Sequence, residues 1–238
     1  MNNIQNYDMD VTTSLTAVET LSNVGTKALV TKRAIYMFTK RSFDIVFSLI
    51  GCLFLLPITA VIKICYIVTG DFEPIIFTQK RIGKGGKLFT FYKFRSMCKN
   101  ADEVLFKLLS ENPEQAEEYR INKKLKNDPR ITKIGRIIRK TSIDELPQLI
   151  NILKGEMSIV GNRPYLPREK DDMGYFYYDI IKTKPGLTGL WQVSGRSDTT
   201  FHKRMELETY YSNCCGLKMD MKIFLKTFKT VLVHKGAK

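Results

Sequence analysis

An almost uninterrupted apolar run from Phe43 to Ile62 constrains the fold of this chain more than any other part of its sequence. A helix needs about 20 such residues to span a bilayer. Pro57 lies inside the run, four residues after Leu53. Proline kinks a helix because it lacks a backbone N–H. Lysines and arginines flank the run at both ends, so the charge bias of an ordinary spanning helix is absent. We therefore predict a re-entrant membrane helix over residues 33–69 that kinks at Pro57 and returns to the same face.

Two other interpretations of the run stay open. A spanning helix kinked at Pro57 has the same length, and a buried helix of a soluble domain can be equally apolar. Residues 1–32, before the run, are rich in Asn, Thr and Ser without a helical or strand period, which predicts a disordered polar tail. We expect no signal peptide, because a basic start followed directly by an apolar core is missing.

The net charge of +14 indicates an anionic partner, which could be nucleic acid, anionic lipid or a phosphorylated substrate. The 5 cysteines include no C-x-x-C pair, and only 2 histidines are present to assist zinc binding. This pattern is typical of a reduced protein that faces the cytosol.

Two β-rich runs, IIFTQKRI and KLFTFYKF, flank a glycine turn and predict a hairpin with strands near 75–81 and 88–95. The glycines lack the spacing of a phosphate loop and precede a strand, which favours a turn. Alternation along the second strand places Lys93 and Arg95 on one face. That face is either a solvated edge or an anion site.

Helical patterns follow the hairpin. Residues 100–126 predict two helices broken at Asn112-Pro113, and a short helix then carries isoleucines on one side. Its other side is basic, with Lys133, Arg136 and Arg139. This basic side leads directly to Asp144 and Glu145, which favours a phosphate site, although a solvated helix face is the alternative.

Asp144 and Glu145 stand at the predicted start of a helix that Gly155 ends. Pro147 is tolerated only in a first turn, so the helix should begin near Ile143 or Asp144. Carboxylates at the positive end of a helix stay ionised and suit a phosphate, a metal ion or both. The alternative is a capping box, in which the side chains of Ser142 and Glu145 only satisfy backbone N–H groups at the start of the helix.

The C-terminal segment predicts a basic amphipathic helix. Its lysines are Lys222, Lys226 and Lys229, and its apolar face comprises Met221, Phe224, Leu225, Phe228, Val231 and Leu232. Such a helix can close the soluble core, but beside a membrane segment we favour a helix lying in the membrane interface. The fold class predicted overall is α+β and mainly helical, with a small hairpin.

Six motifs together resemble the bacterial sugar transferase family, the monotopic polyprenyl-phosphate phosphoglycosyl transferases. They are KRSFDIVFSLI, IFTQKRIG, FYKFRSM, KIGRIIRKTSIDELPQLINILKGEMSIVGNRPYLP, KPGLTGLWQVSGR and MDMKIFLKTFKTVL. The resemblance implies transfer of a sugar 1-phosphate from a UDP-sugar to undecaprenyl phosphate with release of UMP. It also implies a monotopic location on the cytoplasmic face of the inner membrane, in contact with its lipid, and no nucleic acid partner.

The resemblance assigns roles to single residues. Asp144 would be the nucleophile that forms a covalent phosphosugar intermediate, with Mg²⁺ bound beside it and Glu145 as its partner. Arg139 would match the family's arginine five residues before the aspartate, and Arg163 would meet the uridine nucleotide. The family's basic pair falls on Lys93 and Arg95, and Arg136 and Arg196 complete the candidate substrate-binding residues.

Two positions depart from the family pattern. Leu56 stands where a serine usually precedes Pro57, which removes a hydroxyl that could cap the kink, and Asn162 replaces a proline, which softens the loop before Arg163. We expect three parts: a tail over 1–32, the membrane helix over 33–69 and a catalytic domain over 70–238. The sugar, galactose or glucose being slightly favoured, and the oligomeric state, a homodimer included, stay open.

Two rival functions also stay open. A membrane-tethered, non-catalytic protein could bind nucleic acid or anionic lipid through its charge, and a soluble magnesium phosphohydrolase could use the carboxylates. The first predicts indifference to Asp144, and the second leaves the apolar run from Phe43 to Ile62 unexplained.

Overall fold

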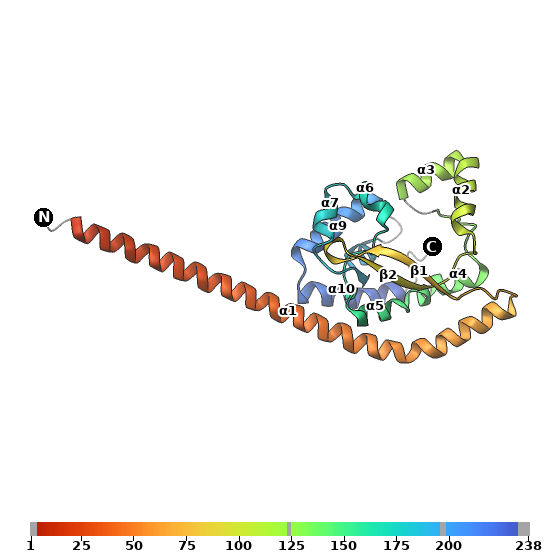
Figure 1. Ribbon diagram of the computed structural model, residues 1–238, viewed down its shortest axis with the longest axis horizontal. Coiled ribbons are helices and arrows are strands. Elements are labelled where there is room, and N and C mark those ends of the chain that lie inside the picture. The colour runs from red at the N-terminus through yellow and green to blue at the C-terminus, as the bar shows by residue number, and fades with distance from the viewer. Residues whose placement is uncertain (1–3, 123–124, 196–198, 233–238) are drawn as a thin grey trace. The chain divides into compact units, whose positions relative to one another are not determined.

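A computed structural model describes residues 4–122, 125–195 and 199–232. The contacts divide the chain into two compact units, Met1–Phe43 and Asp44–Lys238. Helix α1 (Ile4–Val68) runs through the first unit and into the second (Figure 1). Residues 4–32 are therefore helical, where the sequence predicted a disordered tail. The prediction missed this helix because its Asn-, Thr- and Ser-rich residues lack an apolar stripe that would reveal the helical period.

The part of α1 that follows Phe43 has two contrasting faces. Asp44, Ser48, Ile62 and Tyr66 are buried. The opposite face exposes large apolar side chains, among them Leu49, Ile50, Leu53, Phe54, Leu56, Val61 and Ile64. Among the described residues, one helix, Val30–Val68, is long and apolar enough to cross a membrane, with a mean hydropathy of 2.7 and 11% of its window buried. An apolar face left this open is unlike the core helix of a soluble domain.

Helix α1 continues through Pro57 without a break. The Thr59 hydroxyl donates to the carbonyl of Leu55 at 2.6 Å, so a hydroxyl lies near the proline even though Leu56 has replaced the expected serine. The return of this helix to the same membrane face stays a prediction. The predicted boundaries after residues 32 and 69 also stay predictions, whereas contacts within the structure join residues 44–68 to the domain that follows.

Strands β1 (Ile76–Ile82) and β2 (Leu88–Phe94) form the predicted antiparallel hairpin around the 3-10 turn η1 (Lys84–Gly86). Gly85 and Gly86 have φ angles of 68° and 78°, which explains the glycines in the turn. The buried Asn151 pairs with the outer edge of β2, accepting from the Tyr92 N–H at 3.1 Å and donating to the Thr90 carbonyl at 2.7 Å. This amide therefore completes part of an otherwise unpaired strand edge.

Helices α2 (Ala101–Glu111) and α3 (Pro113–Asn122) confirm the predicted break, and α4 (Lys133–Lys140) confirms the short basic helix. The helix predicted to start near Ile143 is instead a 3-10 turn, η2 (Ile143–Glu145), followed by α5 (Gln148–Lys154). Ser142 adopts a left-handed conformation with φ of 58° and its side chain caps nothing, so the capping-box interpretation is wrong. Gly155 ends α5 with φ of 79°, as predicted.

The remaining elements build the other half of this unit around β3 (Ser158–Val160) and β4 (Gly186–Thr188), a short parallel pair that the sequence did not predict. They are η3 (Pro167–Glu169), α6 (Lys170–Met173), α7 (Phe176–Ile180), α8 (Leu190–Ser194), α9 (Phe201–Cys214) and α10 (Leu217–Leu232). Figure 1 shows the hairpin between α4 and α5 on one side and α6, α7 and α9 on the other. With 64% helix, the mainly helical class is confirmed.

Helix α10 both closes the core and leaves an apolar face exposed. Ile223 is buried, and the hydroxyls of Thr227 and Thr188 lie 2.7 Å apart, which ties α10 to β4. The ring of Phe224 contacts Phe47 of α1 at 5.1 Å between centroids. Met221, Leu225 and Phe228 stay exposed, as the predicted amphipathic pattern requires, whereas the side chains of Val231 and Leu232 lie outside the described part of the chain.

Candidate active site

Asp144 is the buried centre of the candidate site. Its side chain lies in η2, and Lys93 reaches it from β2, with 2.7 Å between Lys93 Nζ and Asp144 Oδ2. Asp144 is 2% exposed, so this ion pair is shielded from water on the carboxylate side. A buried carboxylate is stable only when a cation or hydrogen-bond donors compensate its charge, and Lys93 supplies that compensation.

Arg139 lies beside this pair. Its Nε donates to the Ser96 hydroxyl at 2.8 Å. Burial lowers the pKa of Arg139, and the negative charges of Asp144, Asp128 and Glu145 act in the opposite direction. The position of Arg139 follows from the close packing of α4. A Cβ on Gly135 would lie 1.9 Å from the Ser96 carbonyl oxygen, so α4 packs directly against the backbone that follows β2.

The sequence missed a buried ion pair behind Arg139. Asp128 accepts from Arg130 through both oxygens, at 2.8 Å from Nε and 2.7 Å from Nη2. Burial alone would raise the pKa of Asp128, but the hydrogen bonds from Arg130 outweigh it and the pKa is lowered. This bidentate ion pair forms across the turn at Asp128-Pro129. The turn was visible in the sequence, but the pairing was not.

Three other predicted residues lie differently. Arg136 is exposed on α4, away from the buried pair. Arg95 lies just past the end of β2, where its Nη2 pairs with Asp71 at 2.8 Å, its Nε donates to the Pro74 carbonyl, and its guanidinium lies over the Tyr66 ring. Lys93 and Arg95 therefore serve different partners, because the strand alternation ends between them. Arg196 lies outside the described residues.

Arg163 belongs to a second basic group. Its backbone N–H donates to Glu208 Oε1 at 2.8 Å, and Arg81 donates to the neighbouring Pro164 carbonyl at 3.0 Å. Burial, followed by the charge of Arg163, lowers the pKa of Arg81 to about 9. Burial also lowers the pKa of Arg204, again with Arg163 as the next cause. Sequence reasoning identified Arg163 but neither Arg81 nor Arg204.

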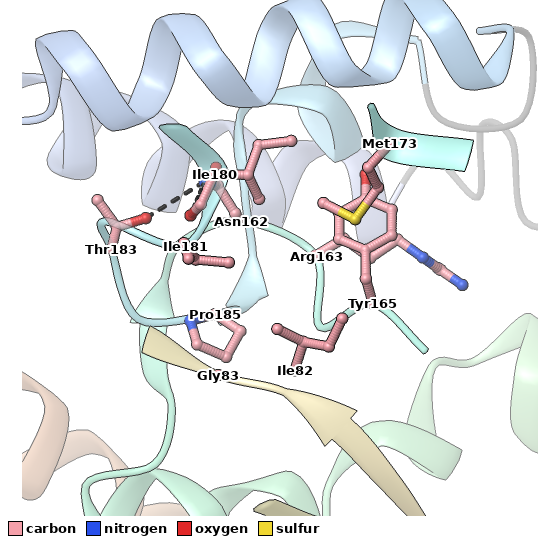
Figure 2. A pocket seen from close by; sticks show the side chains of 10 residues that line it. All are labelled: Ile82, Gly83, Asn162, Arg163, Tyr165, Met173, Ile180, Ile181, Thr183 and Pro185. Carbon is pink, nitrogen blue, oxygen red and sulfur yellow. Dashed lines mark hydrogen bonds between the residues drawn. The ribbon is translucent and has the colours of Figure 1, made fainter. Parts of the chain in front are cut away.

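A small cavity lies beside the loop that carries Arg163 (Figure 2). Figure 2 shows the Arg163 side chain directed away from Asn162 and emerging beyond the Tyr165 ring. The amide of Asn162 donates to the Ile180 carbonyl at 3.1 Å, to Thr183 at 3.2 Å and to Ser212 at 2.6 Å. The expectation that Asn162 softens this loop is therefore wrong, because its side chain ties the loop to two other segments.

Few carboxylates are grouped for a metal ion in the described part of the chain. No cluster of three or more His, Cys, Asp or Glu side chains suited to a metal occurs among the described residues. Mg²⁺ commonly takes one or two protein carboxylates and completes its coordination with water and substrate phosphates. Asp144 and Glu145 fit that pattern as a pair of neighbouring donors.

These features define a class: a mainly helical protein with an exposed apolar helix and a buried carboxylate surrounded by cations, which suits chemistry on a charged phosphate group. Comparison with known proteins is more specific. The family model for bacterial sugar transferases matches residues 35–234. The chain belongs to the bacterial sugar transferase family, which confirms the resemblance noted in its motifs.

Curated relatives agree with this assignment. An undecaprenyl-phosphate galactose phosphotransferase of Salmonella typhimurium is 48% identical over 204 residues, which cover 84% of this chain and 42% of the Salmonella protein. The exopolysaccharide production protein ExoY of Sinorhizobium fredii is 39% identical over 208 residues, covering 86% of this chain and 90% of that protein. The galactosyl transferase CpsE of Streptococcus agalactiae is 43% identical over 206 residues, covering 85% and 44%. The chain thus spans less than half the length of the Salmonella and Streptococcus relatives.

Proposed function

We propose that this protein transfers a sugar 1-phosphate from a UDP-sugar to undecaprenyl phosphate, releases UMP and so begins the assembly of a surface polysaccharide. The observation that carries the proposal is the buried Asp144 carboxylate, paired with Lys93 and neighboured by Arg139. The names of the relatives support it, because they include an undecaprenyl-phosphate galactose phosphotransferase and an exopolysaccharide production protein. UDP-galactose is accordingly the first sugar donor to test.

In the first step, an oxygen of Asp144 attacks the phosphorus that carries the sugar. The bond from that phosphorus to the bridging oxygen of the diphosphate breaks, and UMP leaves with the bonding electron pair. In the second step, an oxygen of undecaprenyl phosphate attacks the same phosphorus, and Asp144 is released as a carboxylate. Each step exchanges one P–O bond for another, so no oxidant or further reactant is needed.

Lys93 and Arg139 serve this chemistry through their charge. An anionic nucleophile approaching a diphosphate is repelled, and fixed cations in a site shielded from water offset that repulsion as charge develops on the phosphoryl oxygens. Mg²⁺, when held by Asp144 and Glu145 together with the diphosphate, would neutralise further charge on the transferred group.

The location that we propose is the cytoplasmic face of the bacterial inner membrane. The exposed apolar face of α1 beyond Phe43 supports it, and so do Met221, Leu225 and Phe228 on α10. Two successive half-reactions suit this location, since the water-soluble donor and the lipid acceptor need not occupy the site together. The rival role as a non-catalytic binder is not favoured, because binding through surface charge requires no buried Asp–Lys pair.

A transfer assay tests the proposal. Membranes containing the full chain are incubated with Mg²⁺, undecaprenyl phosphate and radiolabelled UDP-galactose, UDP-glucose or UDP-N-acetylglucosamine. Label should enter the organic phase with one of these donors, and UMP should appear in equal amount. Asp144→Asn should lose turnover by at least about 10³-fold while still inserting into membranes. Asp171→Asn, a change at an exposed aspartate on α6, is the matched control and should keep full activity.

Intact-mass measurement provides the decisive readout for the two-step mechanism. With donor and Mg²⁺ but no lipid acceptor, the wild-type chain should gain the mass of one phosphosugar, mapped to Asp144. An active enzyme that never shows this adduct would instead use direct displacement. Absence of labelled lipid with every UDP-sugar, in membranes that contain the folded chain, would refute the proposed function itself.

A further inference from the structure

Ser142 has an unusual backbone conformation two residues before Asp144. Its φ of 58° and ψ of 15° place it in the left-handed region, and among the described residues it is the only one besides glycines with a positive φ. The Cβ atom makes this conformation unfavourable for a serine, whereas glycine adopts it freely. Such a residue persists only where the surrounding structure requires it.

The Ser142 side chain does not account for this conformation, since it makes no cap hydrogen bond to η2. The end of α4 is satisfied by the preceding residue, because the Thr141 hydroxyl donates to the Ile137 carbonyl at 3.0 Å. The Ser142 backbone joins the two elements. Its N–H donates to the Arg139 carbonyl at 3.1 Å, and its carbonyl accepts from the Glu145 N–H at 3.2 Å. The requirement therefore lies in the course of the backbone.

The phase of α4 shows what this conformation achieves. Residues that follow one another by four or seven positions lie on one face of a helix, so a continued α4 would place Asp144 on the face of Ile137 and Lys140. Both side chains are exposed, that of Ile137 by 65%. In a continued helix Asp144 would therefore face the outside of the domain. In the structure Asp144 is 2% exposed and pairs with Lys93.

Glu145 would take the inward place if α4 continued. It follows Ile138 by seven positions, and Ile138 is buried, as is Gly135 on the same face. The close packing of Gly135 against the Ser96 backbone fixes this phase, because α4 cannot rotate without moving Gly135 away. A continued helix would thus direct Glu145 into the domain and Asp144 out of it. The left-handed residue between α4 and η2 exchanges the two carboxylates.

We propose that Ser142 is a positioning residue, whose left-handed backbone directs Asp144 instead of Glu145 toward Lys93. Ser142 acts through the direction that it gives to the chain, and its hydroxyl is not needed for this role. The proposal rests on the proposed function for the role of Asp144 as nucleophile. The placement of the carboxylate is a property of the folded chain, so it can also be measured without turnover.

The relative stability of glycine and alanine variants tests the backbone conformation. At a right-handed position alanine is the more stable of the two, and Thr141, with φ of −89°, is the adjacent control. At Ser142 the order should be reversed. In thermal unfolding of the full chain in detergent, Ser142→Gly should therefore outlast Ser142→Ala, whereas Thr141→Ala should outlast Thr141→Gly. If Ser142→Ala is as stable as Ser142→Gly, the residue is not left-handed in solution and the inference is wrong.

Paired substitutions test the placement of Asp144. Removal of one partner of a buried ion pair is destabilising, so Asp144→Asn should lower the unfolding temperature in a Ser142→Gly background. Valine is strongly disfavoured in the left-handed region, so Ser142→Val should misplace Asp144, and adding Asp144→Asn should then cause a much smaller shift. Equal shifts in both backgrounds would show that Asp144 reaches Lys93 without the help of Ser142. Where Ser142→Val does not fold, Ser142→Ala replaces it, with a smaller difference in the same direction.

Turnover gives an independent readout. Ser142→Gly should keep kcat within about threefold of the wild type, and Ser142→Val should lower kcat by about 10²-fold with a much smaller change in the KM for UDP-sugar. Thr141→Val places the same side chain one residue earlier and should keep kcat.

Loss of activity in Ser142→Gly as complete as in Ser142→Val would mean that the hydroxyl is required, which would overturn the inference. If the wild type transfers sugar phosphate from no UDP-sugar, the proposed function fails, and the two unfolding experiments still decide whether Ser142 places Asp144.

Discussion

Single buried side chains set the electrostatics of this protein. The buried Asp144 carboxylate is stable inside the domain because Lys93 neutralises its charge. Asp128 is stable there because Arg130 donates hydrogen bonds to both of its carboxylate oxygens. Glu208, at 1% exposure, has no comparable ion pair among the described residues. Burial raises the pKa of Glu208, whereas the hydrogen bonds from Arg130 lower the pKa of Asp128. The same type of side chain therefore plays different roles according to the cation that the fold places beside it.

Glu208 should make stability depend on pH. Burial raises its pKa from 4.5 to about 7, so between these values the folded protein keeps a proton that the unfolded chain has released. Its contribution is fully present below pH 4.5 and is lost as pH rises through about 7, on the order of 3 kcal/mol in all. Unfolding in detergent, measured from pH 5 to pH 8, should show this decline in the wild type.

The matched variants isolate this effect. Glu208→Gln keeps an oxygen that can accept from the Arg163 N–H but cannot ionise, so it should flatten the decline. Glu206→Gln, two residues earlier on α9 and exposed, should leave the decline unchanged. An equal pH dependence in the wild type and Glu208→Gln would show that another group is responsible.

Helices and strands position the candidate catalytic residues through a few close contacts. Asp44 of α1 accepts from the Ser158 hydroxyl at 2.9 Å and from the Ile159 N–H at 2.8 Å, which fixes the apolar helix to β3. Gly51 lies against Leu149 of α5, so that a Cβ there would come within 2.6 Å of Leu149 Cδ1. The segments that contain β3 and α5 thus pack directly against the helix that we propose to be in the membrane.

The contact of α4 with the end of β2 gives a prediction at the level of elements. Gly135→Ala places a methyl group 1.9 Å from the Ser96 carbonyl oxygen. The clash can be relieved only by moving the backbone of α4 or the backbone at Ser96, which is costly. We expect a loss of stability of about 3 kcal/mol and a displacement of Arg139, which bonds Ser96. Thermal unfolding and the transfer assay measure the two effects.

Gly216→Ala is the control for this prediction, because a Cβ there meets nothing within 4 Å and the backbone is not left-handed. It should change the free energy of unfolding by less than about 1 kcal/mol. If the Gly135→Ala protein is as stable and active as the wild type, α4 does not pack directly against the Ser96 backbone in solution.

The whole molecule must present its site to the cytoplasm if UDP-sugar is its donor. We predict that both flanks of the apolar run lie on the cytoplasmic side. Single cysteines at Ser42 and at the exposed Phe72, in a chain otherwise free of cysteine, are exposed to an impermeant maleimide outside spheroplasts. Neither should be labelled until the membrane is permeabilised. Labelling of Ser42→Cys alone from outside would establish an ordinary spanning helix, and Pro57→Leu should then have little effect on topology.

Local patterns were sufficient to predict several parts of this protein from its sequence. The apolar run, the hairpin, the break at Asn112-Pro113, the basic helix before Asp144 and the helix end at Gly155 all follow from periodicity and turn chemistry within a few residues. Asp144 itself was identified from its neighbours in the sequence and from the family motifs. Such features are predictable because the residues that cause them are adjacent in the chain.

Tertiary structure decided the rest. The short strands β3 and β4 pair across 28 residues, from Ser158 to Gly186, and they carry no alternation long enough to be detected. Arg95 turns to Asp71 instead of joining Lys93. The loop of Arg163 accepts a hydrogen bond from Arg81 of β1 at the Pro164 carbonyl and donates one to Glu208 of α9. The sequence by itself determined which segments are apolar, helical or basic, since those properties are local. Only the packing of distant segments determined which charges become neighbours, because ion pairing depends on distance in space and not along the chain.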